Sequence, residues 1–180
     1  MNKILKLTVI LCLICAVVAG VLGGVNALTK DRIQAQKDAK TAEAYGAVLK
    51  ADKYEEVEFD KASFPKVSSV NKTSNDSGYV VVSTFSGAQG NITMAVGVDN
   101  DLKCTGISII EHSETSGLGA VAASSSEAGE KFRSQFVGED ANIALTKGGG
   151  NIDAIAGATI TSTAVTNAVA NSIAVVASLG

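Results

Sequence analysis

Residues 78–109 read GYVVVSTFSGAQGNITMAVGVDNDLKCTGISI, and this stretch decides the fold of the chain. Tyr79–Phe85 is rich in β-branched and aromatic residues, which favour strands. Apolar residues alternate with small or polar ones in Ile92–Val98, and the alternation resumes in Thr105–Ile109. Asp99-Asn100-Asp101 supplies a turn between these two runs. The pattern predicts an antiparallel sheet with a hairpin that buries one face.

The segment before this sheet predicts a loop and a helix. Residues 68–77 are rich in Ser, Asn and Lys, which predicts a loop after Pro65. Residues 31–50 are mostly good helix formers with little apolar patterning. We therefore expect a polar connecting helix over residues 30–50 and a single domain over residues 51–180.

The N-terminal segment, residues 1–29, predicts a membrane anchor. No charged residue lies between Leu7 and Thr29, and a helix of that length at ~1.5 Å per residue crosses the ~30 Å hydrocarbon core. A cleaved signal peptide is the alternative, because Lys3 and Lys6 precede the apolar run and Val25-Asn26-Ala27 resembles a cleavage site. The run exceeds the ~7–15 apolar residues of a signal peptide, which favours the anchor.

Two small motifs lie inside this apolar segment. Gly20 and Gly24 form a G-x-x-x-G pair, which permits close approach by another membrane helix or reflects the frequency of glycine in such helices. Cys12 and Cys15 have C-x-x-C spacing, but thiols inside an apolar helix are more often small hydrophobic residues than metal ligands. We predict no metal site.

The chain after the hairpin predicts two helices and a short strand. We expect a helix from about Ser125 to Phe136, a break at Gly148–Gly150 and a strand over Asn151–Ile155. A terminal helix over Ser162–Leu179 follows, capped by Thr161 or Ser162. Its apolar stripe comprises Val165, Val169, Ile173 and Val176. The expected fold class is α+β: one N-terminal transmembrane helix, then a single domain with an antiparallel sheet and flanking helices.

Composition and charge exclude some functions. The net charge is -3, and no cluster of Lys or Arg interleaves with aromatics, so we expect no nucleic-acid partner. Glu111 and Glu114 point to opposite sides if the strand continues, which argues against glycosidase chemistry. His112 is the only histidine, and its position at a strand end suits a structural role more often than proton transfer. No catalytic residue is assigned.

The stretch DAIAGATITS, residues 153–162, carries the chemistry. A strand, a glycine turn and a helix N-terminus favour a phosphate, because unpaired N–H groups and the positive end of the helix dipole point at it. By composition alone the Thr and Ser residues also suit a simple helix cap.

This stretch resembles the flavinylation motif of the FMN-binding subunits of Rnf and sodium-pumping quinone oxidoreductase complexes. In that family the Thr of Gly-Ala-Thr carries FMN as a phosphoester, which implies Thr159 as the acceptor. Ala156 stands where the family has Ser or Thr. The residues that match the motif are Asp153, Gly157, Ala158, Thr159, Thr161 and Ser162.

Two further stretches support the resemblance. Glu111–Gly119 looks like the family's His-x-Glu-Thr-Pro-Gly-Leu-Gly loop beside the flavin, with Ser116 in place of Pro. Val25–Ile33 resembles the end of the membrane helix in the family's Rnf members. The loop adds five expected cofactor-binding residues: Glu114, Thr115, Gly117, Leu118 and Gly119.

The resemblance implies an electron-relay component of an ion-translocating ferredoxin:NAD oxidoreductase, the Rnf complex, with covalent FMN and no activity alone. Its implied partners are the other membrane and peripheral Rnf subunits, and a flavin transferase that uses FAD and a divalent metal. The implied location is the cytoplasmic (inner) membrane, single-pass, with the FMN domain on the periplasmic or extracellular side.

Three alternatives stay open. The chain also resembles the FMN-binding C component of the Na+-translocating NADH:quinone reductase, although its short length suits the Rnf member of the family, RnfG, better. It also fits a freestanding FMN-binding membrane protein. The third alternative is a cofactor-free, membrane-tethered binding module in which Thr159 only caps a helix.

Overall fold

The computed structural model describes residues 3–180. It contains one compact unit that ends at Ala39 and a second unit over Lys40–Gly180. Helix α1 (Lys3–Val48) begins in the first unit and supplies its last turns to the second. Near the N-terminus α1 is long and apolar enough to cross a membrane, and large side chains such as Leu13 and Val21 are exposed there. These features are those of a membrane-associated helix.

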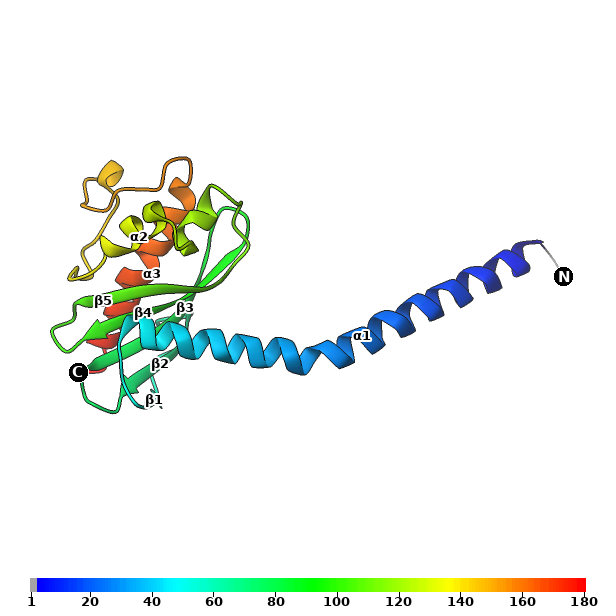
Figure 1. The fold of residues 1–180 in the computed structure, drawn as a ribbon, viewed down its shortest axis with the longest axis horizontal. Helices are drawn as coiled ribbons and strands as arrows, with labels where there is room; N and C mark the ends of the chain where they lie inside the picture. The colour runs from blue at the N-terminus through cyan, green and yellow to red at the C-terminus, as the bar shows by residue number, and fades with distance from the viewer. Residues whose placement is uncertain (1–2) are drawn as a thin grey trace. The chain divides into compact units, whose positions relative to one another are not determined.

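The second unit is built on a five-stranded antiparallel meander in which neighbours in sequence are neighbours in the sheet (Figure 1). The strands are β1 (Tyr54–Val57), β2 (Val67–Thr73), β3 (Gly78–Ser86), β4 (Asn91–Asp99) and β5 (Cys104–His112). Val96 of β4 pairs with Val81 of β3 and Ile107 of β5, which confirms the predicted hairpin. The α+β fold class is also confirmed.

The loop predicted over residues 68–77 is wrong for its first half, which forms β2. A register shift between Val67 and Ser69 interrupts the alternation of side chains, so the apolar pattern is not visible in the sequence. Asn71 is buried and donates from Nδ2 to the Tyr45 hydroxyl at 3.1 Å. The Tyr45 hydroxyl, which is distant in sequence, supplies the hydrogen bond that the buried Asn71 side chain requires. The polar composition of this segment therefore misled the prediction.

One face of the sheet carries the main core. Helices α2 (Glu127–Ser134) and α3 (Thr159–Ala177) lie on this face (Figure 1). Ser126 caps α2 inside the predicted range 125–136, and its side chain accepts from the Gly129 N–H. The predicted stripe of α3 is confirmed as buried: Val165, Val169, Ile173 and Val176. Removal of this apolar area from water stabilises the α3–sheet packing.

The other face of the sheet is covered by the last turns of α1. Ala44 and Val48 form a second buried cluster with Val80 and Ala95. The prediction that the hairpin buries only one face is therefore wrong, because the small residues on the second face were read as solvent-facing. They leave room for a helix instead.

Two paired glycines leave space for the end of α1 against the sheet. Gly97 lies opposite Gly106 in the β4–β5 ladder, and a Cβ on Gly97 would come 2.7 Å from the Val48 carbonyl oxygen. The Thr105 hydroxyl donates to that same carbonyl at 2.6 Å. The last carbonyls of a helix have no intrahelical donor, and this hydrogen bond satisfies one of them.

The C-terminal segment differs from the prediction in two places. The expected strand over Asn151–Ile155 is wrong: only one parallel bridge forms, between Leu145 and Ile152. The terminal helix begins at Thr159 rather than Ser162, and Ala158 stands at its N-cap without a side-chain cap. The prediction that Thr161 or Ser162 caps this helix is therefore wrong. Two short 3-10 helices complete the unit: η1 (Gly119–Ala123) and η2 (Thr146–Gly148).

The close contact between Gly97 and the end of α1 can be tested by substitution. Gly97→Ala places a methyl group against the Val48 carbonyl, and we expect it to destabilise the domain by about 1–3 kcal/mol through overpacking. Thermal unfolding of the full chain in detergent measures the change. Gly46→Ala is the matched control, because a Cβ there meets no atom within 4 Å and improves helix propensity. Equal melting temperatures for both variants would contradict the close contact between Gly97 and the Val48 carbonyl.

Candidate functional site

A glycine turn holds Thr159 at the start of α3. Gly157 has a φ of +73°, in the left-handed region that favours glycine, and the Ala158 N–H donates to the Ile155 carbonyl at 2.9 Å. Thr159 is the first residue of α3 and is exposed. The N–H groups in the first turn of a helix have no intrahelical acceptor, and the helix dipole is positive there. An exposed residue that carries a hydroxyl thus lies at an anion-binding position.

The next two polar residues of α3 face inward. Ser162 is fully buried; its hydroxyl accepts from the Ile155 N–H at 3.0 Å and donates to the Ala158 carbonyl at 2.9 Å. It ties both sides of the glycine turn together. Thr161 is 1% exposed, and its hydroxyl donates to Oε2 of Glu114. Both were expected to bind the cofactor, and in the structure both hydroxyls have protein partners.

Glu114 is a buried carboxylate, 8% exposed, in the loop after β5. Its Oε1 accepts from the Gln89 N–H at 3.0 Å and its Oε2 accepts from Thr161. Burial raises the pKa of Glu114, but the bonds from the Gln89 N–H, the Thr161 hydroxyl and the Ala88 N–H outweigh it and the pKa is lowered overall. Glu114 is therefore ionised at neutral pH. Glu111, by contrast, is exposed on β5.

The loop after Glu114 is closed by its own backbone. The Thr115 carbonyl accepts from the N–H groups of Leu118 and Ala120, each at 3.2 Å, and Gly117 has a φ of +78°. Leu118 is 44% exposed and lies over the turn, since a Cβ on Gly157 would meet its Cδ2 at 3.1 Å. The two motifs that are far apart in sequence therefore meet at Leu118 and Gly157.

Two cavities lie beside this meeting point. One of about 380 Å³ is lined by both motifs and by α2; its walls include Gly117, Val121, Lys131, Phe132, Asp153 and Ala156. A second of about 320 Å³ includes Thr159, Leu145, Lys147, Thr163 and Asn167. Gln135 fixes the first cavity's wall: its Oε1 accepts from the Asp153 N–H at 2.7 Å and its Nε2 donates to the Asp153 carbonyl at 3.2 Å.

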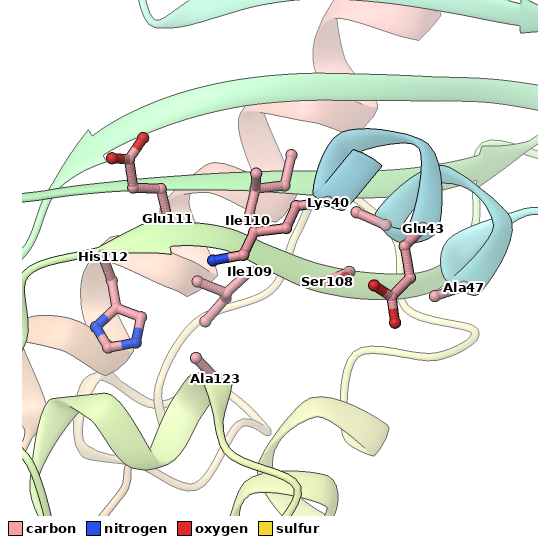
Figure 2. A pocket seen from close by; sticks show the side chains of 10 residues that line it. Lys40, Glu43, Ala47, Ser108, Ile109, Ile110, Glu111, His112 and Ala123 are labelled. Atoms are coloured by element: carbon pink, nitrogen blue, oxygen red, sulfur yellow. The ribbon is translucent and has the colours of Figure 1, made fainter. Parts of the chain in front are cut away.

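A third cavity, of about 440 Å³, lies between the last turns of α1, strand β5 and η1. Figure 2 shows Lys40 and Glu43 on the helix side and His112 on the strand side. His112 Nδ1 accepts from the Glu114 N–H at 3.2 Å, which favours the tautomer with its proton on Nε2. The histidine thus supports the backbone at Glu114.

The structure groups the expected site residues into two sets. Gly157, Thr159, Thr115, Gly117 and Leu118 are exposed around the turn, and Asp153 is exposed beside the first cavity. Ala158, Glu114, Gly119, Thr161 and Ser162 are buried behind it.

Sequence reasoning missed Ile160, Lys131 and Gln135. Ile160 is 62% exposed next to Thr159, and its apolar side chain at a helix N-terminus was the available signal. Lys131 and Gln135 lie one helical turn apart at α2 and its C-terminal cap, and no local pattern links them to residue 153.

These residues fit an FMN. The exposed Thr159 and the helix N-terminus suit its phosphate, and a Cβ on Gly157 would meet only the flexible Leu118 side chain within 4 Å. The cavity of about 380 Å³ has apolar walls with Lys131 and Gln135 on one side, as planar ligands with a polar edge require.

The comparisons with known proteins agree with the fold. Residues 87–174 match the FMN-binding domain family, and residues 1–48 match the RnfG N-terminal region. The molecule is therefore an FMN-binding domain joined to a membrane-associated helix.

Similar proteins are the G components of ion-translocating oxidoreductase complexes. The one from the ion-translocating oxidoreductase complex of Methanosarcina acetivorans is 35% identical over 93% of this chain and 91% of the relative. The one from the proton-translocating ferredoxin:NAD(+) oxidoreductase complex of Clostridium ljungdahlii is 34% identical over 93% and 89%. The one from the Na(+)-translocating ferredoxin:NAD(+) oxidoreductase complex of Acetobacterium woodii is 42% identical over 54% and 48%. The chain belongs to the RnfG family.

The buried carboxylate predicts a pH dependence of stability. Because the native pKa of Glu114 lies below its ordinary value of 4.5, its ionised form stabilises the native state above pH 4.5, and this contribution is lost as pH falls through the native pKa. We expect wild type to be more stable than Glu114→Gln at neutral pH, with a difference that shrinks on acidification below 4.5. Chemical unfolding in detergent across that range measures it. A difference independent of pH would contradict the ionised state.

Proposed function

We propose that this chain is the electron-relay component of an ion-translocating ferredoxin:NAD oxidoreductase and carries FMN covalently, through a phosphoester to Thr159. One observation carries the proposal: Thr159 is an exposed, hydroxyl-bearing residue at the first position of α3, shortly after the Gly157 turn. The match to the RnfG N-terminal region favours this complex over the related quinone reductase.

The attachment step is a phosphoryl transfer that needs a partner enzyme. The Thr159 hydroxyl oxygen attacks the FMN phosphorus of FAD on a flavin transferase with a bound divalent metal. A threonine O–P bond forms, the pyrophosphate P–O bond breaks, and AMP leaves with the electron pair while the hydroxyl proton is released. The exposure of Thr159 supports this step, because the transferase must reach the oxygen.

The chain's own residues then hold and place the cofactor. The N–H groups of the first turn of α3 stabilise the phosphodiester charge. Gly117 lines the cavity, Leu118 lies against the Gly157 turn beside it, and Gln135 keeps the wall at Asp153 in place. When bound, FMN supplies the redox chemistry by accepting and releasing electrons. The tether keeps its effective concentration high in this cavity.

The wider assignment follows from the same proposal. We assign residues 1–29 to the anchor, 30–50 to the connecting segment of α1 and 51–180 to a domain on the periplasmic or extracellular side of the cytoplasmic membrane. The other Rnf subunits deliver and accept electrons and move the ion. A tether suits that side of the membrane, because a flavin lost there cannot be replaced from the cytoplasm.

Substitution of the acceptor tests the attachment. Full-length Thr159→Val, co-expressed with a flavin transferase, is expected to lack the added mass of FMN less water in intact-protein mass spectrometry and to show no fluorescence on the denatured band. Thr163→Val is the control: this exposed threonine lies one turn further along α3 and should leave loading unchanged.

Two outcomes would contradict the proposal. Full loading of Thr159→Val would place the attachment elsewhere. Bare polypeptide from native membranes, at its calculated mass, would instead favour a cofactor-free binding module.

A further inference from the structure

The orientation of α3 determines whether Thr159 is accessible. Successive residues in an α-helix rotate by about 100°, so residues two positions apart face nearly opposite directions. Thr161 is buried and Thr159 is exposed, as this geometry requires. A contact that holds the Thr161 side chain in the interior therefore also keeps the Thr159 side chain at the surface.

The group that fixes Thr161 is the carboxylate of Glu114. It accepts from the Thr161 hydroxyl on α3 and from the Gln89 N–H in the β3–β4 turn, and its own backbone belongs to the loop after β5. One buried charge thus joins three segments. Hydrogen bonds to an ionised acceptor are about twice as strong as neutral ones, so this junction is stiff.

Two glycines pack directly against this junction. A Cβ on Gly119 would overlap both Glu114 Oε2 and Thr161 Oγ1, and a Cβ on Gly87 would overlap Glu114 Oε1. His112 also holds the backbone of Glu114 from the side of the third cavity. The side chain is buried, and each carboxylate oxygen accepts a hydrogen bond from the protein.

We infer that Glu114 and Thr161 are positioning residues rather than cofactor ligands: their hydrogen bond sets the rotation of the first turn of α3 and so presents the Thr159 hydroxyl for flavin attachment. This inference rests on the proposed function of Thr159. It assigns to Glu114 and Thr161 a role in maturation, which precedes any electron transfer.

Kinetics of attachment test the inference. The full chain, produced in a host without flavin transferase and purified in detergent, is incubated with purified transferase, FAD and Mg²⁺, and its mass is followed with time. We expect Thr161→Val to lower the attachment kcat about tenfold or more, because misplacement of a reacting group has that cost, with the KM for FAD unchanged. Thr161→Ser, which keeps the hydroxyl, should recover the wild-type rate within about twofold.

A second pair of variants addresses the carboxylate. Glu114→Gln removes the charge and is expected to slow attachment. Thr166→Val is the matched control, because it removes another buried hydroxyl of α3, one that donates to the Ser162 carbonyl at 2.9 Å rather than to Glu114. Its attachment rate should equal that of wild type even where its melting temperature falls as much as that of Thr161→Val.

The outcomes separate the two claims. Transfer to wild type and Thr161→Val at equal rates would overturn the inference and leave Thr159 as the acceptor. Equal slowing by Thr161→Val and Thr166→Val would also overturn it, since helix stability would then explain both. No transfer to the wild-type chain would overturn the proposed function and this inference with it.

Discussion

The packing of α3 on the β3–β4 face of the sheet is the constraint on which the rest of the domain depends. Val165 and Val169 of α3 share one buried cluster with Val81 and Val96 of the sheet. This apolar contact is non-directional, so it secures the helix against the sheet without fixing its rotation. The polar contacts at the helix N-terminus supply the direction: Ser162 closes the turn and Thr161 meets Glu114.

The same sheet serves two purposes on its two faces. One face orients the helix whose first residue we propose as the flavin acceptor. The other face packs against the end of α1. There the Thr105 hydroxyl donates to the Val48 carbonyl, and the absence of side chains at Gly97 and Gly106 leaves space for the helix. The last turns of the membrane-associated helix are therefore part of the domain's own fold, and the helix ends against the sheet rather than in a free linker.

Several features were readable from local patterns. The hairpin follows from strict alternation over Ile92–Val98, the membrane-associated helix from an uncharged run after Leu7, and the buried stripe of α3 from its spacing. The strand β2 was not readable, because a bulge and the polar residues Ser69 and Asn71 hide its alternation. The start of α3 was also misplaced, since no side chain caps it.

The sequence by itself determined the hairpin, the helices on the main face of the sheet and the membrane-associated segment, and it carries the motif from which we propose Thr159 as the acceptor. Only the tertiary structure decided which members of that motif face outward and which are occupied by protein partners. The reason is physical: periodicity and propensity act within a segment, whereas the role of a buried hydroxyl depends on which group accepts its hydrogen bond. For Thr161 that acceptor lies 47 residues away, on a loop that only the folded sheet brings near.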